Sequence, residues 1–140
     1  MPQRYYLDTS IWLDLFEKRD EPGFAKGKYA QIIVDRCIKK QERVIISDAI
    51  VTEMKIVGYD SWHFFELVES LSLNVEFVES SLRMQNRAKD LSKNLNIPKG
   101  DVLHALLAGK EEAIIISWDQ HFKSLYHICK VLTPREIIDF

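Results

Sequence analysis

The sequence predicts an α/β fold with a central, mainly parallel sheet, and three observations lead to this class. The chain has 140 residues, 46% of them hydrophobic, which suits one domain with a core large enough to fold alone. Short runs rich in β-branched and aromatic residues alternate with stretches of helical spacing. At least two of these runs are almost entirely apolar, as in a parallel sheet that helices cover on both faces. We therefore expect a single domain over residues 1–140.

Five segments have the composition of strands, namely residues 4–7, 43–46, 74–78, 113–116 and 128–132. Between them, apolar residues recur at helical spacing in four stretches, and we expect each stripe to pack into the core. The stripes consist of Tyr29, Ile32, Ile33 and Cys37; Phe64, Leu67, Val68 and Leu71; Leu82, Met84, Ala88, Leu91 and Leu95; and Val102, Leu103, Leu106 and Leu107. No internal repeat or linker rich in Pro, Gly or Ser divides the chain.

Charge and apolar content exclude several classes of protein. Nineteen basic and 21 acidic side chains give a net charge of −2, which argues against a strongly basic nucleic-acid-binding surface but not against a local basic groove. No apolar run approaches the ~20 residues of a membrane-spanning helix, and no apolar signal segment follows Met1, so we expect a cytoplasmic protein without membrane attachment. Cys37 and Cys129 are far apart in sequence and are expected to be free, buried thiols.

Acidic residues gather where the carboxyl ends of the predicted strands would lie, which is the usual ligand-binding edge of such sheets. Asp8 directly follows the first strand. Ser47 ends the second strand as a natural helix N-cap, and Glu53 lies less than two turns further, so its side chain can lean back toward the start of that helix. Asp101 enters the first turn of a helix after a proline–glycine break, and Asp119 lies just beyond the fourth strand. We expect all four carboxylates to meet at one edge.

Any one of these acids alone can be explained as a helix cap or a partner of the helix dipole. Four converging carboxylates, however, would repel one another and would have raised pKa values without a cation. The set is better explained as a site for a hard divalent ion such as Mg²⁺ or Mn²⁺, which carboxylates, waters and phosphate oxygens bind.

The segments that carry these acids resemble the successive motifs of the PIN-domain ribonucleases, best known as VapC-type toxins. The matching segments are Tyr6-Leu7-Asp8-Thr9-Ser10, Ser47 with Glu53, Gly100-Asp101-Val102-Leu103-His104-Ala105 and Ser117-Trp118-Asp119-Gln120-His121-Phe122. The resemblance spans nearly the whole chain, and Ser117 stands where threonine is more familiar, which keeps the hydroxyl. It implies a three-layer α/β/α sandwich.

The resemblance also implies an activity, namely Mg²⁺- or Mn²⁺-dependent endonucleolytic hydrolysis of RNA phosphodiester bonds by the toxin of a toxin–antitoxin pair. Four acids are the implied catalytic residues and metal ligands: Asp8 and Asp101 for the principal ion, with Asp119 and Glu53 completing its shell. A homodimer and an antitoxin partner are further implications of the resemblance.

Supporting residues are expected around these acids. Ser10 and Ser117 would hold the carboxylates or waters through their hydroxyls. His104 is expected to be packed and hydrogen-bonded rather than a ligand, because Mg²⁺ prefers oxygen. Asp14 fits the polar face of a helix or a supporting role near Asp8. Five basic residues lie near the motifs in sequence and are candidates for contacts to the RNA backbone, namely Arg4, Lys55, Lys99, Lys110 and Lys123.

Three other interpretations are weaker. A PIN-like module that binds RNA or protein without cutting need not keep all four acids. A receiver-type phosphoacceptor domain needs an aspartate at a central strand end, and residues 74–78 are followed by Glu79-Ser80-Ser81. An aspartyl phosphatase needs a second aspartate two residues after the first, which Asp8-Thr9-Ser10 lacks.

Overall fold

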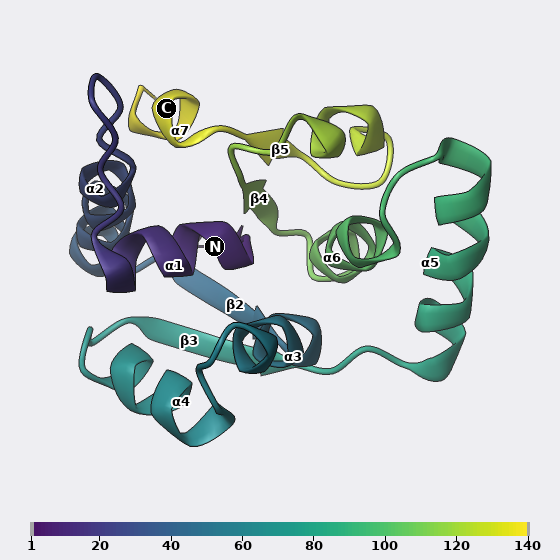
Figure 1. Ribbon diagram of the computed structural model, residues 1–140, viewed down its shortest axis with the longest axis horizontal. Helices are drawn as coiled ribbons and strands as arrows, with labels where there is room; N and C mark the ends of the chain where they lie inside the picture. The colour runs from purple at the N-terminus through teal and green to yellow at the C-terminus, as the bar shows by residue number, and fades with distance from the viewer. Residues whose placement is uncertain (1, 140) are drawn as a thin grey trace.

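Five parallel strands form one sheet at the centre of the protein, whose computed structural model describes residues 2–139 (Figure 1). The strands are β1 (Arg4–Leu7), β2 (Arg43–Ser47), β3 (Asn74–Val78), β4 (Ile114–Ile116) and β5 (Val131–Leu132), in the spatial order β3-β2-β1-β4-β5. The helices are α1 (Thr9–Glu17), α2 (Lys26–Lys40), α3 (Asp48–Ile56), α4 (Ser61–Glu69), α5 (Leu82–Leu95), α6 (Lys99–Lys110), the 3₁₀ helix η1 (Gln120–Leu125) and α7 (Pro134–Ile138).

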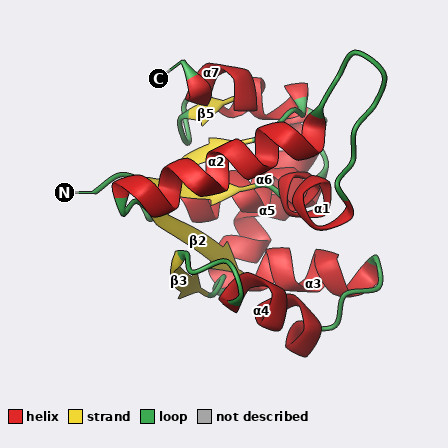
Figure 2. Ribbon diagram, turned by 90° about the vertical axis from the view of Figure 1, so that its left-hand side faces the viewer, coloured by secondary structure: helices red, strands yellow, loops and turns green. Residues whose placement is uncertain are grey.

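Helices cover both faces of this sheet, so the predicted three-layer α/β/α sandwich is confirmed. Helices α1, α2, α4 and α7 lie on one face, and Figure 2 shows α2 crossing in front of the strands. Helices α6 and η1 lie on the other face, with α5 outside them and packed mainly against α6 (Figure 1). The middle strands β1, β2 and β4 are almost entirely buried, because their apolar side chains meet helices on both sides.

The strand predictions are confirmed except at the last strand. Strands β1 and β3 have the predicted bounds, β2 is one residue longer and β4 one residue shorter. Residues 128–130 of the predicted fifth strand lie outside β5, because the backbone N–H groups of Ile128 and Cys129 donate to the carbonyl of Leu125 and continue the turn after η1. Lys130 contacts the sheet through its carbonyl, which accepts from the backbone N–H of Ile115. Strand β5 is therefore only the pair Val131 and Leu132.

Most residues of the four apolar stripes are buried or half-buried, as predicted, but three are exposed. The prediction that Ile32 is a core residue is wrong, because α2 buries the neighbouring stripe that includes Ile33 and Cys37. Leu82 and Leu95 are exposed because they lie at the two ends of α5, which has α6 as its main support. Both cysteines are free and buried, as predicted.

Strand β1 lies between β2 and β4. The chain first forms β2 and β3 on one side of β1, and then crosses to the other side to form β4 and β5. The carboxyl end of β1 is therefore the switch point of the sheet, where open α/β sheets place their ligand crevice. Helices α1 and α3 begin directly after the carboxyl ends of β1 and β2. No helix within residues 2–139 is long and apolar enough to cross a membrane.

Candidate metal centre

Asp8 lies between β1 and α1 and is only 9% exposed. It occupies the N-cap position of α1, but its side chain makes no capping hydrogen bond. Instead, the hydroxyls of Ser10 and Ser117 donate to its Oδ2 atom over 3.0 and 2.9 Å. Asp8 is thus held by both predicted serines, and the helix-cap explanation does not account for its carboxylate.

Glu53 is held by a buried chain of hydrogen bonds that starts at β1. His104 of α6 is 1% exposed and its Nε2 lies 2.6 Å from Glu53 Oε1, which also accepts from the Thr9 hydroxyl over 2.5 Å. On the other side of the imidazole, Nδ1 lies 2.6 Å from the hydroxyl of Tyr6. That hydroxyl also shares a hydrogen bond of 2.6 Å with Ser47, which caps α3 as predicted by accepting from a backbone N–H. The position of Glu53 is therefore fixed from the core outward.

Asp101 and Asp119 both contact the imidazole of His121. The Nδ1 atom of His121 lies 3.1 Å from Asp101 Oδ2 and 3.3 Å from Asp119 Oδ1. Asp119 also caps η1, because its Oδ1 accepts from the backbone N–H of His121 over 2.9 Å. The Ser117 hydroxyl accepts from the backbone N–H of Asp119 over 3.0 Å while it donates to Asp8, so one serine connects the two halves of the site.

The four predicted acids thus meet at the carboxyl edge of the sheet, arranged in two groups. In each group the ligand atoms lie within 4.8 Å of one another: Asp8, Glu53 and His104 form one, and Asp101, Asp119 and His121 form the other. In each group the histidine is hydrogen-bonded to an acid, His104 to Glu53 and His121 to Asp101.

Each carboxylate uses one oxygen for hydrogen bonds and keeps the other free. Within residues 2–139, no hydrogen bond reaches Asp8 Oδ1, Glu53 Oε2, Asp101 Oδ1 or Asp119 Oδ2, whereas the second oxygen of each acid is engaged as described above. Four carboxylates with a free oxygen each match the oxygen-rich set that hard divalent ions prefer. The residues therefore fit a hard divalent metal ion.

The electrostatics of the site also favour a cation. Burial raises the pKa of Asp8, with a smaller contribution from the charge of Glu53, while His104 and the serine hydroxyls act in the opposite direction. Burial likewise raises the pKa of Asp101, and the negative charges of Asp119 and Asp8 add to it against the hydrogen bond from His121. A bound cation would relieve both penalties, because it stabilises the ionised carboxylates.

A cavity of about 390 Å³ opens beside Asp8 and Glu53. It is also lined by Ile56 and Val57, which are 79% and 51% exposed at the end of α3. On the side of α6, Gly100 allows a close approach, because a Cβ atom there would lie 3.3 Å from Glu53 Oε2. The first half of the site is therefore reachable from solvent across an apolar rim.

Two of the five basic residues predicted near the motifs lie away from this edge. Arg4 begins β1, at the opposite end of the strand from Asp8, and pairs there with Glu76 and Glu111. Lys110 ends α6, whereas Asp101 lies in its first turn. Each of these basic residues is near an acid in sequence but lies at the opposite end of the same strand or helix, so proximity in sequence did not mean proximity to the site.

Sequence reasoning missed the partners that orient the acids. Thr9 and Tyr6 were not singled out, and His121 was not predicted to contact Asp101 and Asp119. A usable signal existed for His121, which lies two residues after Asp119. His104 is packed and hydrogen-bonded, as predicted, but its partner Glu53 comes from another helix, which its place in the sequence does not indicate.

A family model described as the PIN domain matches residues 5–128. The chain belongs to the PIN-domain family. This PIN domain matches no curated protein.

Solved structures share the fold of this PIN domain at low sequence identity. VapBC2 from Rickettsia felis bound to a promoter DNA fragment has a TM-score of 0.67 and 18% identity, covering 94% of this chain and 98% of the other. A toxin–antitoxin complex from Klebsiella pneumoniae has a TM-score of 0.66 and 18% identity, covering 93% and 97%. VapBC-1 from nontypeable Haemophilus influenzae has a TM-score of 0.64 and 15% identity, covering 95% and 99%.

Proposed function

We propose that this PIN domain is a divalent-metal-dependent endoribonuclease that hydrolyses RNA phosphodiester bonds. The observation that carries the proposal is the set of four carboxylates at the switch point of the sheet, each with one oxygen held by the protein and the other free. A non-catalytic binding module has no need of this arrangement. Membership of the PIN family supports the same conclusion, since PIN domains are in general nucleases.

In this proposal Asp8, Glu53, Asp101 and Asp119 hold the ion, which is Mg²⁺ or Mn²⁺. When bound, such an ion supplies a hydroxide near neutral pH and stabilises charge on the scissile phosphate. The chain's own residues orient the ligands: Ser10 and Ser117 fix Asp8, and the His104 and Thr9 side chains fix Glu53.

We also propose that the protein is the toxin of a toxin–antitoxin pair and acts in the cytoplasm as a homodimer. The shared fold with structures described as VapBC or toxin–antitoxin complexes supports the toxin role and an antitoxin partner. The exposed apolar side chains of Ile56 and Val57 beside the candidate metal centre suit a site that a protein partner covers.

The test is cleavage of total RNA in Mg²⁺, in Mn²⁺ and in chelator. We expect Asp8→Asn and Asp101→Asn to retain the fold and lose activity by at least about a hundredfold, because each removes a charged ligand. Asp90→Asn on α5 is the matched control, since it makes the same chemical change away from the site. Full activity of either site variant in a nuclease-free preparation would contradict the proposal.

A further inference from the structure

A second cavity lies between α5 and α6, well away from the candidate metal centre. We call it the α5–α6 cavity; its volume is about 470 Å³. Its lining includes the carboxyl end of α6, where Gly109 lies about 12 Å along the helix from Asp101. The apolar part of the lining comes from Met84, Leu91, Leu106 and Ile128.

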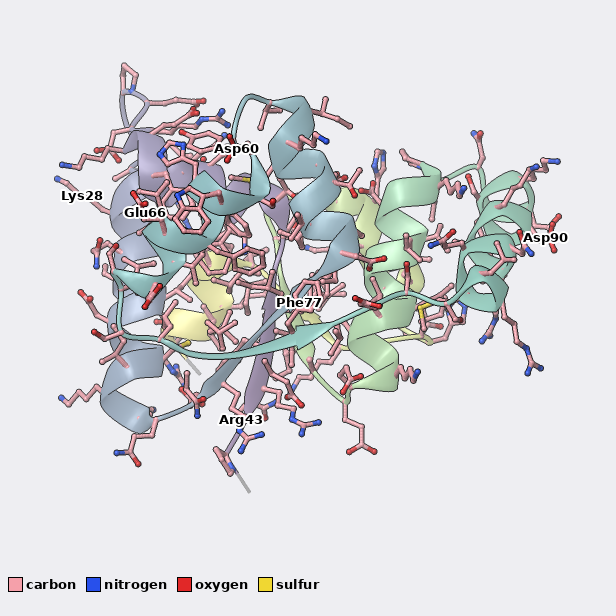
Figure 3. The ribbon with its side chains drawn as sticks, turned by 90° about the horizontal axis from the view of Figure 1, so that it is seen from below. Lys28, Arg43, Asp60, Glu66, Phe77 and Asp90 are labelled. Atoms are coloured by element: carbon pink, nitrogen blue, oxygen red, sulfur yellow. The ribbon has the colours of Figure 1, made fainter. Side chains whose placement is uncertain are left out.

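The charged side chains that line the α5–α6 cavity are cationic. Arg83 and Arg87 come from α5 and Lys110 from the end of α6. Among the residues that the structure describes, no carboxylate oxygen lies within 4.0 Å of these three side chains, and the cavity lining contains no acid. The single acid of α5, Asp90, points away from α6 (Figure 3). Positive charge here is therefore unpaired and available to an anionic ligand.

One aromatic ring lines the α5–α6 cavity, and a second lies against that ring. His127 lines the cavity, and the neighbouring Tyr126 is 79% exposed with its ring centroid 5.9 Å from that of His127. Aromatic rings and guanidinium planes are the surfaces on which unpaired RNA bases stack. Arg83 and Arg87 are one helical turn apart, about 6 Å along the axis, so they can contact separate phosphates. Exposed rings beside unpaired cations favour single-stranded nucleic acid over an acidic peptide.

We propose that the α5–α6 cavity binds the backbone and a base of single-stranded RNA, apart from the candidate metal centre. The choice of RNA as ligand rests on the proposed ribonuclease function. Such a site explains how a chain of net charge −2, with four acids at its reaction edge, holds a polyanion: the affinity comes from a separate basic surface on α5 and α6.

The test is fluorescence anisotropy with a short labelled single-stranded RNA in chelator, which prevents cleavage, at several salt concentrations. We expect Arg83→Gln with Arg87→Gln to weaken binding about tenfold and to make the salt slope shallower by about 1.4, the loss of two phosphate contacts. Lys89→Gln with Lys93→Gln is the matched control, because it removes the same charge from α5 outside the cavity. Lys110→Gln tests the cavity from α6.

The proposal is supported if the cavity variants bind RNA more weakly and with a shallower salt slope, while the control variant keeps the wild-type affinity and slope and all melting temperatures are unchanged. Equal losses of RNA affinity in the cavity and control variants would show that only net charge matters, and would overturn the proposed binding site. Binding of polyglutamate without binding of RNA would indicate an acidic protein ligand and would also overturn the proposal. Metal-dependent cleavage by the wild type is measured separately. Its absence overturns the proposed function alone, whereas cleavage without cavity-dependent binding overturns this inference alone.

Discussion

His104 is one of two side chains that hold Glu53. It is fully buried, and its two ring nitrogens contact Glu53 and Tyr6. We expect His104→Phe to lower the free energy of unfolding by about 1–3 kcal/mol, because it removes a hydrogen-bond partner from the buried Tyr6 hydroxyl and from the half-buried Glu53 carboxylate. Urea unfolding measures this loss, and His104→Gln, which keeps a polar end, is expected to recover part of it.

The same contact predicts how the loss depends on pH. Burial lowers the pKa of His104, but the hydrogen bond and charge of Glu53 outweigh it, and the net shift is upward. A histidine whose pKa rises on folding adds stability below its unfolded pKa, about 6.5, and this stability disappears as the pH rises through the folded value. The deficit of His104→Phe should therefore be larger near pH 6 than near pH 9. Equal deficits would contradict a charged contact with Glu53.

Asp14 shows a different kind of buried acid. It is 2% exposed and its Oδ2 atom has no hydrogen-bond partner within residues 2–139. Burial raises its pKa from 3.8 to about 6, so folding favours the protonated form and stability falls as the pH rises through that interval. We expect Asp14→Asn to be more stable than wild type above pH 6, by up to about 2–3 kcal/mol.

The measurement for Asp14 is the melting temperature against pH in metal-free buffer. The advantage of Asp14→Asn should vanish below about pH 4, where the wild-type carboxyl is protonated in both states. Asp35→Asn on the exposed side of α2 is the control and should show no such trend. A variant less stable than wild type at pH 8 would show that the carboxylate is needed.

At the scale of elements, the sequence predicted strands and the order of the acids well, because both follow from local pattern. Apolar runs define β1 and β4, Asp8 directly follows β1, and Asp119 lies three residues after the end of β4. The exposure of Leu82 and Leu95 could not be predicted, since it depends on how α5 stands outside α6. The two groups of ligands could not be predicted either, because Ser117 joins Asp8 to Asp119 only in three dimensions.

The contact of α6 with the chain after η1 depends on one glycine. A Cβ atom on Gly109 would lie 2.5 Å from the carbonyl oxygen of Ile128, which is backbone and cannot turn aside. Alanine normally stabilises a helix by about 1 kcal/mol relative to glycine. We expect Gly109→Ala to be destabilising instead, by about 1–3 kcal/mol, because α6 or the loop must move.

Thermal unfolding tests this contact against Gly100→Ala in the first turn of the same helix. There the new Cβ atom would lie 3.3 Å from Glu53 Oε2, and a small rotation of the carboxylate about the Oε1 atom that His104 and Thr9 hold relieves this contact. Gly100→Ala should therefore be nearly neutral or mildly stabilising in metal-free buffer. A gain of stability in Gly109→Ala equal to that of Gly100→Ala would contradict the close approach of α6 to Ile128.

At the scale of the whole molecule, we expect the candidate metal centre to couple ion binding to folding. Burial raises the pKa values of Asp8 and Asp101, so their ionised forms cost stability in the folded protein, and a cation that binds only the folded state offsets this cost. At a free Mn²⁺ concentration of 100 times Kd the stabilisation is about 2.7 kcal/mol, which raises Tm by roughly 10 °C in a domain of this size. Asp101→Asn should respond far less, and monovalent salt of equal ionic strength should not reproduce the shift. Equal shifts in wild type and Asp101→Asn would place the stabilising ion elsewhere on the surface.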